Sequence, residues 1–311
     1  MKILLIRNDN IGDLVCTTPA IEALRKKYPD AKIDIVVNSY NFLAIRNNPF
    51  VDKIYSYTKP KHKKSLSDKI KALFGKIKIF WDIKKEKYDV AVVFRSGYSS
   101  SAEQFSNISG ANMRIGVKDK NNKDNFTHHI QPNTHEHEVE FCYRCLEHLE
   151  VKANDEKPFF YVDEELKEKY KEYKNYILFH ISSRIKENRY PKEKFKEIID
   201  NIDENIIISC EPDDIESAKW LENNTKAKYI PTKSLLELCG IISNVKLFVT
   251  LDGGAMHIAP ALNTKTIAIS GKTNMDKWYP WGYKNLVIQD ESRIAKNIDS
   301  KLVIEKIKGS L

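Results

Sequence analysis

The chain has 311 residues, of which 41% are hydrophobic and 30% charged, which indicates a globular protein long enough for two domains. No stretch is apolar for long enough to cross a membrane, and strand-like residues begin at Ile3, so neither a membrane span nor a signal peptide is expected. Five scattered cysteines are typical of a reduced cytosolic protein. The net charge of +8 favours an acidic partner, which could be nucleic acid, an anionic membrane or a phosphorylated substrate.

The chain opens with a predicted strand, loop, helix and second strand. Residues 3–6 are a short apolar run, residues 14–28 show apolar side chains at helical spacing, and residues 33–37 are the next strand. The turn contains a single glycine, Gly12, where a dinucleotide-binding fingerprint needs three. Binding of NAD is therefore not expected.

The same loop carries two carboxylates, Asp9 and Asp13. A carboxylate held within hydrogen-bond reach of a substrate hydroxyl can remove its proton as the oxygen reacts. For Asp13 the alternative is a cap at the start of the helix.

The segment from residue 60 to residue 87 combines many lysines with apolar side chains at largely helical spacing. A basic amphipathic helix of this kind fits an anionic membrane surface or a phosphorylated lipid headgroup. The alternative is a solvated helix whose apolar face packs on the domain core. The sequence leaves both open.

Residues 89–94 are a predicted strand, followed by a polar loop that begins with Arg95 and Ser96. A histidine-rich stretch further on lacks the carboxylate or cysteine partners and the helical spacing of a known metal site, so no bound metal is expected. Its members are His128, His129, His135 and His137. Cys142 and Cys145 have no second pair with which to bind zinc and fall in a predicted helix, which favours a structural role.

A charged helix at residues 164–175 leads into a second set of strands. Residues 176–180 are an apolar strand, and residues 206–209 are another, after a helix around Phe195. The loop after the first of these strands is rich in hydroxyl and basic side chains, which suit an anionic ligand or simply a solvated loop. They are Ser182, Ser183, Arg184, Lys186 and Arg189.

A strand, a glycine turn and a helix follow in the C-terminal half. Residues 246–251 are an apolar strand, Asp252-Gly253-Gly254 ends it, and residues 255–262 begin a helix. Free backbone N–H groups, the helix dipole and the small glycines make such a turn a binding site for an anion. The next strand, residues 266–270, puts the turn at the carboxyl edge of the sheet, where open α/β sheets bind ligands. The alternative is an ordinary turn whose Asp252 caps the helix.

Motifs in both halves resemble those of the lipopolysaccharide heptosyltransferases, glycosyltransferase family nine. In the N-terminal half these are Ile6-Arg-x-Asp-x-Ile-Gly-Asp13, Arg114-Ile-Gly116 and His137-Glu-Val-Glu140. In the C-terminal half they are Arg189-Tyr-Pro191, Asp252-Gly-Gly-Ala-Met-His-Ile-Ala259 and Gly271-Lys-Thr273.

Two positions depart from the family pattern. Gly253 stands where a hydroxyl is common, and Asn188 stands where the family has a lysine that is proposed to contact the donor diphosphate. A cation is needed because the departing diphosphate gains negative charge as the sugar bond breaks. Arg184, Lys186 or Arg189 is expected to supply it.

The resemblance implies an α/β fold of the GT-B type, in which two Rossmann-like βαβ domains face each other across a cleft. The expected domains are an acceptor-binding domain at residues 1–160 and a nucleotide-sugar-binding domain at residues 161–311, with a C-terminal helix from about residue 294 that returns to the first domain. The implied reaction moves a heptose from ADP-heptose to the inner core of lipopolysaccharide or lipooligosaccharide. It is expected to invert the anomeric carbon and to need no metal and no cofactor beyond the donor.

The resemblance also assigns roles to single residues. Asp13 is the expected catalytic base. Glu211 lies in a turn expected to face the nucleotide base or ribose, although carboxylates in such turns commonly cap helices. The expected acceptor-binding residues are Arg7, Asn10, Gly12, Arg95 and Ser96. The expected donor-binding residues are Ser182, Ser183, Arg184, Lys186, Arg189, Glu211, Asp252, Gly253, Gly254, His257 and Thr273.

The implied partners are a nucleotide sugar and a phosphorylated glycolipid, the lipid A–core. The protein is expected to be a cytoplasmic monomer at the cytoplasmic face of the inner membrane, where it contacts anionic lipid, with no nucleic-acid partner. One alternative is transfer of another nucleotide-linked sugar in surface-glycan synthesis, which Asn188 and Gly253 favour. The other is a non-catalytic polyanion-binding protein, but the lysines lack the interleaved aromatic platform of single-strand binders.

Overall fold

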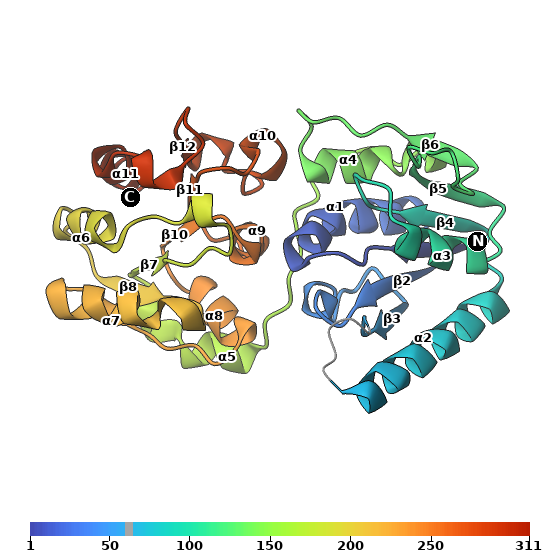
Figure 1. Ribbon diagram of the computed structural model, residues 1–311, viewed down its shortest axis with the longest axis horizontal. Helices are drawn as coiled ribbons and strands as arrows, with labels where there is room; N and C mark the ends of the chain where they lie inside the picture. Colours follow the sequence, from blue (N-terminus) through green and yellow to red (C-terminus); the bar gives the residue numbers. More distant parts are fainter. Residues whose placement is uncertain (60–64) are drawn as a thin grey trace. The chain divides into compact units, whose positions relative to one another are not determined.

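The chain divides into two units, Met1–Tyr161 and Val162–Leu311, in a computed structural model that describes residues 1–59 and 65–311 (Figure 1). The boundary expected from the sequence lies between residues 160 and 161. Each unit contains one parallel sheet with helices around it.

The first unit is built on the strand order β3-β2-β1-β4-β5-β6. All pairings in this sheet are parallel, so each strand is reached by a crossover. The elements are β1 Lys2–Ile6, α1 Ile11–Lys27, β2 Lys32–Asn38, β3 Lys53–Tyr57, α2 Leu66–Glu86, β4 Val90–Val93, α3 Ser100–Ile108, β5 Met113–Val117, β6 His128–Ile130 and α4 Glu138–Arg144.

The second unit is built on the strand order β12-β11-β10-β7-β8-β9, again with parallel pairing throughout. Its elements are α5 Glu164–Lys169, β7 Ile177–His180, α6 Lys192–Asp200, β8 Ile206–Ser209, α7 Ile215–Asn224, β9 Lys228–Tyr229, α8 Leu235–Ile242, β10 Leu247–Leu251, α9 Gly254–Ala261, β11 Thr266–Ser270, α10 Met275–Trp278, β12 Val287–Gln289 and α11 Ser300–Lys308.

Both sheets have the same topology. Numbered within each unit, the strands run 3-2-1-4-5-6, the order of a Rossmann fold. The order reverses between β1 and β4 in the first unit and between β7 and β10 in the second, and ligands of such folds bind outside the carboxyl ends of these strands. The prediction of an α/β protein with two Rossmann-like units is confirmed.

The strands form where the sequence is apolar without alternation, because helices cover both faces of a parallel sheet. In the second unit Ile177 and Phe179 belong to one hydrophobic cluster and Leu178 to another. Successive side chains of a strand point to opposite faces, so these clusters lie on the two faces of one sheet.

Residues 66–86 of the lysine-rich segment form one long helix, α2, with two different apolar sides. Ile83 is buried, and Ile79 and Phe80 pack against the core cluster that contains Phe105. The other apolar side is exposed to solvent. The alternative in which the apolar face of the helix packs on the domain core is therefore correct for one of its two apolar sides. Three lysines of the predicted segment lie outside the described residues, namely Lys61, Lys63 and Lys64.

The C-terminal helix belongs to the second unit. Val303 and Ile307 of α11 are 0% exposed and join the cluster that contains Ile177 and Phe195. The helix also contacts α6. The apolar side of this helix is therefore used within its own unit, and the return of the segment to the N-terminal domain stays a prediction.

The five cysteines are all buried free thiols. Burial raises the pKa of Cys142 to about 12, which keeps this thiol protonated and unreactive at neutral pH. Within residues 1–59 and 65–311, no helix has both the length and the apolar composition needed to span a bilayer.

Candidate active site

Each unit gathers polar side chains at the carboxyl ends of its two central strands. In the first unit these residues follow β1 and β4, and in the second they follow β7 and β10. These are the points at which the strand order reverses, so the fold itself favours them as ligand sites. Most of the residues singled out from the sequence lie at these strand ends.

In the first unit, Arg7 lies at the centre of a carboxylate cluster that consists of Arg7, Asp9, Asp13 and Glu138. Its side chain is 1% exposed. Nε lies 2.9 Å from Asp9, Nη2 lies 2.9 Å from Asp13, and Nη1 lies 2.8 Å from Glu138. Nη1 also donates to the backbone carbonyl of Phe94, at the end of β4. One guanidinium therefore fixes three carboxylates and joins the ends of both central strands.

The carboxylate cluster itself contains three carboxylates and one guanidinium, and a second guanidinium, that of Arg95, lies 3.5 Å from Asp9. Burial raises the pKa of Asp9 to about 6, with Arg7 opposing the change and the neighbouring Asp13 adding to it. The pKa of Arg7 is raised despite its burial, since Asp9, Glu138 and Asp13 all stabilise its charge. Arg7 stays charged, and Asp9 titrates near neutral pH.

Asp13 is the third residue of α1, whose N-cap is Asn10. The alternative in which Asp13 caps the helix is therefore wrong. Its side chain is 16% exposed, so part of the carboxylate remains accessible while Arg7 holds the other part. A carboxylate in the first turn also interacts favourably with the helix dipole.

The remaining predicted acceptor residues surround the cluster. Arg95 follows β4, and its Nη1 lies 3.5 Å from Asp9 and 3.4 Å from the amide oxygen of Asn8. Asn10 is exposed, Gly12 is buried and Ser96 is half-buried. Arg7 and Arg95 thus meet at Asp9, while Arg7 itself is nearly closed to solvent.

Sequence reasoning assigned no role to Glu138. It is 0% exposed and supplies the third carboxylate to Arg7. The available signal was the motif His137-Glu-Val-Glu140, which matched a family landmark. In the structure, His137 and Glu140 of this motif form a capping box that starts α4 at Glu138.

In the second unit, hydrogen bonds connect the turns after β7, β10 and β11 into a turn network that consists of Ser183, Asn188, Asp252, Gly271 and Thr273. The carboxylate of Asp252 accepts from Asn188 Nδ2 and Thr273 Oγ1, both at 2.9 Å. Asn188 also accepts from the backbone N–H of Gly271 at 2.9 Å. Ser183 Oγ donates to the carbonyl of Asp252 at 2.9 Å.

The turn network and the start of α9 show the structural roles of Asp252 and Asn188. The N-cap of α9 is Gly253, with no side-chain cap, so the interpretation of Asp252 as a helix cap is wrong. Asn188 is 0% exposed, so it works as a structural link among three turns. Its amide nitrogen fills this buried position by donating to the carboxylate of Asp252 and to the hydroxyl of Thr273.

The glycines of these turns differ in what they require. Gly253 has an extended backbone with φ of 169°, and a Cβ placed on it would meet nothing within 4 Å. A Cβ on Gly271 would lie 2.0 Å from the carbonyl oxygen of Glu187 and 2.8 Å from the backbone nitrogen of Ala295. Packing therefore demands glycine at position 271 but not at position 253.

The predicted basic side chains converge on one pocket, the basic pocket, in the second unit. Its volume is about 550 Å³. It is lined by Arg184, Lys186, Arg189, Tyr190, Pro191 and Lys296. Lys296 was not predicted, because it follows β12 and no local pattern marks it. Four cations at one pocket suit a phosphorylated ligand.

The other predicted donor residues lie close to these turns. Ser182 accepts from the backbone N–H of Glu211 at 2.8 Å and so joins the turns after β7 and β8. Glu211 is exposed and makes no side-chain cap, so the cap interpretation is wrong for this residue too. His257, in the first turns of α9, is 8% exposed and lies edge-on to Trp278 at 5.8 Å between ring centroids.

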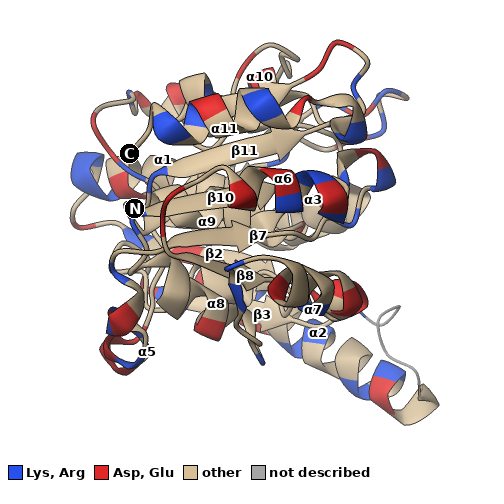
Figure 2. Ribbon diagram, turned by 90° about the vertical axis from the view of Figure 1, so that its left-hand side faces the viewer, with Lys and Arg blue, Asp and Glu red and all other residues tan. Residues whose placement is uncertain are grey.

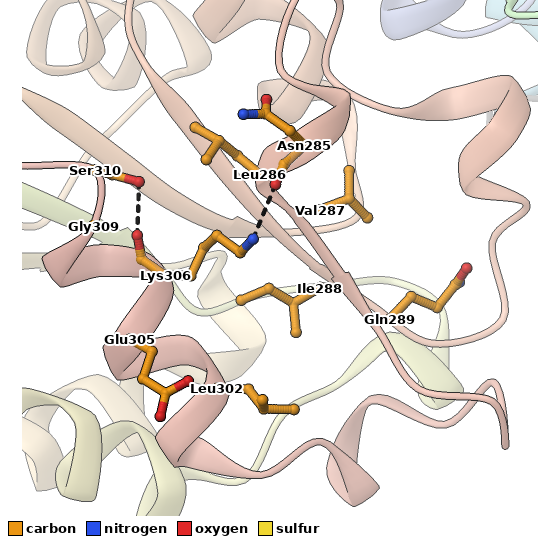
Figure 3. A pocket seen from close by; sticks show the side chains of 10 residues that line it. All are labelled: Asn285, Leu286, Val287, Ile288, Gln289, Leu302, Glu305, Lys306, Gly309 and Ser310. Atoms are coloured by element: carbon orange, nitrogen blue, oxygen red, sulfur yellow. Dashed lines mark hydrogen bonds between the residues drawn. The ribbon is translucent and has the colours of Figure 1, made fainter.

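A second hollow of about 510 Å³ lies between the edge strand β12 and α11 (Figure 3). Lys306 crosses it and donates to the carbonyl of Asn285 at 3.0 Å. All predicted site residues are described, and none of them lines this hollow. The candidate active site is therefore assigned to the strand ends. Within residues 1–59 and 65–311, no group of three or more His, Cys, Asp or Glu side chains is arranged to hold a metal ion.

Comparison with known families matches residues 76–307 to the family described as glycosyltransferase family 9 (heptosyltransferase). The chain belongs to glycosyltransferase family 9. It is accordingly a glycosyltransferase, and the resemblance inferred from its motifs is confirmed. Asp13 lies before the matched residues, so its role rests on the N-terminal motif and on the geometry of the carboxylate cluster.

Individual members of family 9 resemble the chain over most of its length. Lipopolysaccharide heptosyltransferase 3 of Escherichia coli is 26% identical over 290 residues, which cover 87% of this chain and 83% of the relative. Among solved structures, the family 9 glycosyltransferase of Veillonella parvula DSM 2008 has a TM-score of 0.84 at 19% identity. The match covers 99% of this chain and 96% of the Veillonella chain. The E. coli heptosyltransferase WaaC with ADP has a TM-score of 0.80 at 16% identity, with 100% of both chains covered. These similarities confirm the GT-B class of fold for the two Rossmann-like units.

Proposed function

We propose that this family 9 enzyme transfers a heptose from ADP-heptose to a sugar in the inner core of lipopolysaccharide. Family membership and the activity named for the relatives support the reaction class. The observation that carries the proposal is the carboxylate cluster. In this cluster Arg7 holds a partly accessible Asp13 near the carboxyl ends of β1 and β4, where the strand order reverses. Asp13 also belongs to the motif that carries the proposed base of the family.

In the proposed reaction, Asp13 takes the proton from an acceptor hydroxyl. The acceptor oxygen bonds to the anomeric carbon while the bond from that carbon to the diphosphate oxygen breaks, and ADP leaves. Arg7 keeps Asp13 in one direction through a 2.9 Å ion pair. Asp9 and Glu138 pair with the same guanidinium and so help to hold Arg7 in place.

We assign the donor to the second unit. The basic pocket offers Arg184, Lys186, Arg189 and Lys296 to the diphosphate, whose charge rises as the sugar leaves. The start of α9 adds backbone N–H groups and the positive end of its dipole. The turn network keeps the turns after β7, β10 and β11 in register and so preserves this arrangement.

The proposed transfer inverts the anomeric carbon and needs no metal ion. Inversion follows because a single displacement places the attacking oxygen opposite the departing diphosphate. Side-chain cations of the basic pocket take the electrostatic role that a metal ion has in other phosphate-transferring enzymes.

One observation favours a second candidate donor. Asn188 occupies the position of the family's diphosphate-binding lysine, and it is fully buried in the turn network. The cations that contact the donor therefore differ from those of the family motif. A different nucleotide-linked sugar is the candidate that this difference supports.

Ligand-dependent melting distinguishes these candidates, because a ligand that binds only the folded protein raises its melting temperature. We expect a larger rise with ADP-heptose than with UDP- or GDP-linked sugars, and none with a short oligonucleotide. Lys296→Gln should reduce the rise given by ADP-heptose but not the smaller rise given by AMP, while Lys301→Gln on α11 should change neither. A larger rise with another nucleotide sugar would replace the proposed donor, and a response to the oligonucleotide alone would reject the proposal.

A further inference from the structure

Helix α2 carries a row of exposed apolar side chains, the apolar stripe, on the side that does not face the core. Its members and exposed fractions are Leu66 74%, Ile70 45%, Leu73 50%, Phe74 67%, Ile77 39% and Trp81 61%. They make up more than half of the large hydrophobic side chains that are exposed in residues 1–59 and 65–311. A contiguous exposed patch of this kind marks an interaction surface.

The apolar stripe is a second face, distinct from the side that packs against the core. At 3.6 residues per turn, its members fall within roughly 100° of the helix circumference. Ile79 and Ile83, which pack on the core of the first unit, point to the other side. Only Ile83 of the 21 residues is fully buried, and Ile79 and Phe80 are partly buried against the core, so packing within the unit does not account for the apolar stripe.

Charges on α2 are segregated around the apolar stripe. Lys71, Lys78 and Lys85 are exposed and recur every seventh residue, which places them along one edge of the stripe. The acidic residues Asp68, Asp82 and Glu86 fall on the opposite side of the helix by the same geometry. The apolar surface is therefore bordered by positive charge and kept apart from negative charge.

Figure 2 shows the N-terminal turns of α2 extending away from the sheet of its own unit, with lysines along the helix. In Figure 1 the same end of the helix projects past β3. A projecting helix can lie along a flat surface without a collision with the sheet behind it.

We propose that α2 lies on the surface of a bilayer that contains anionic lipid, with the apolar stripe inserted among the lipid headgroups. The aliphatic and aromatic side chains enter the boundary between headgroups and acyl chains, and the flanking lysines contact the lipid phosphates. Trp81 has the amphipathic ring that is enriched at this depth of a membrane.

Two other occupants fit the helix less well. A polynucleotide would satisfy the lysines but would leave the aliphatic Leu66, Ile70 and Leu73 uncovered. A second copy of the chain would cover the apolar stripe, but a symmetric pair would bring the lysines of the two helices together. An anionic bilayer satisfies both kinds of side chain at once. This inference needs neither a sugar donor nor an acceptor, so it stands independently of the proposed reaction.

The test is co-sedimentation of the full chain with vesicles of phosphatidylcholine alone and of phosphatidylcholine with one quarter phosphatidylglycerol. Leu73→Ser with Phe74→Ser removes part of the apolar stripe, and Lys71→Gln with Lys78→Gln and Lys85→Gln removes its charged edge. The matched controls are Leu302→Ser with Leu311→Ser, both 54% exposed, and Lys219→Gln with Lys301→Gln and Lys308→Gln, all exposed. Unchanged melting temperatures establish that the variants are folded.

The wild-type chain should bind the anionic vesicles and should release them as salt rises. The serine variant should bind at least about tenfold more weakly. The glutamine variant should bind about a hundredfold more weakly, because each of the three lysines near an anionic surface adds a similar amount to the binding free energy. Both control variants should bind like the wild type.

Three results would overturn the inference. They are equal binding of the wild type to neutral and anionic vesicles, binding to neither, and α2 variants that bind as well as the controls. Sedimentation velocity without lipid provides the remaining outcome. A dimer that the serine variant loses would assign the apolar stripe to a second copy of the chain.

Discussion

At the scale of single residues, Arg7 gives the first unit its chemistry. Its guanidinium is 1% exposed and contacts Asp9, Asp13 and Glu138. Loss of the cation would leave three carboxylates with no countercharge from this side chain, which is strongly destabilising. The sequence predicted a contact between Arg7 and the acceptor. Its burial supports a positioning role, in which Arg7 acts on the acceptor through Asp13.

Substitution of Asp13 by Asn tests its role as the base. The amide keeps the shape of the carboxylate and much of its hydrogen bonding but cannot accept the proton. We expect turnover to fall on the order of a hundredfold or more. The affinity for the donor, measured by calorimetry, should hardly change, because the proposed donor residues lie in the second unit.

Asp9→Asn is the matched control for that experiment, since Asp9 has the same partner and a similar exposure of 12%. It should lower turnover much less than Asp13→Asn does. An Asp13→Asn enzyme with full turnover, paired with a weak Asp9→Asn enzyme, would move the base to Asp9.

At the scale of elements, the sequence predicted the strand–turn–helix units well, because these depend on local patterns. The apolar runs at residues 3–6 and 206–208 became buried strands. The turn at Asp252 became the start of α9, one residue earlier than expected. The fold class followed from the repetition of such units along the chain and from the family motifs.

The parts that could not be predicted depend on contacts between distant residues. Glu138 contacts Arg7 from 131 positions away, and Asn188 reaches Thr273 across 85. No periodicity records such pairs, so the sequence indicates only that a charge is missing at Asn188 and does not predict its hydrogen bonds. For α2, the spacing correctly predicted an amphipathic helix, but which side meets the core depends on the neighbouring α3 and β3.

The turns after β10 and β11 each contain a glycine, Gly253 and Gly271, and we expect substitutions at the two positions to have different effects on stability. Gly271→Ala forces a Cβ within 2.0 Å of the carbonyl oxygen of Glu187, so the backbone of one turn must move. This shift would break the hydrogen bond from Gly271 N–H to Asn188. We expect a fall in melting temperature of several degrees and a loss of donor binding, measured by thermal shift with and without ADP-heptose.

Gly253→Ser is the matched control in the neighbouring turn. Its backbone is extended, and the space around the new Cβ is open. The melting temperature should stay within about a degree of the wild type, since surface changes of this kind are nearly neutral. The serine also restores the hydroxyl common in the family, so donor affinity should be kept or raised. Equal stability of the two variants would contradict the packing argument.

At the scale of the whole molecule, the two units have separate hydrophobic cores and need not unfold together. Each contains a buried group whose protonation is coupled to folding. In the first unit burial raises the pKa of Asp9 to about 6. In the second, burial lowers the pKa of His180 to about 4, with Asp214 opposing the change. The two shifts have opposite consequences for stability.

For Asp9 the folded pKa lies above the ordinary value of 3.8. The folded unit therefore binds the extra proton between about pH 4 and pH 6, and its stability is lost as the pH rises through this window. For His180 the folded pKa lies below the ordinary value of 6.5. The unfolded chain then binds the extra proton, so this stability is present above pH 6.5 and is lost as the pH falls toward 4.

Hydrogen exchange followed by mass spectrometry can measure the two units separately between pH 4.5 and pH 6.5, after correction for the intrinsic exchange rate. Relative to wild type, Asp9→Asn should gain stability in the first unit as the pH rises, and His180→Asn should gain stability in the second unit as the pH falls. Each change is limited to about 1.4 kcal/mol per pH unit, the value for one proton. Groups that do not interact with the substituted side chain cancel in these differences, so the slopes report on His180 and on Asp9 together with its charged neighbours. Slopes of the same sign in the two units, or a response of both units to either variant, would show that the two buried groups do not control separate transitions.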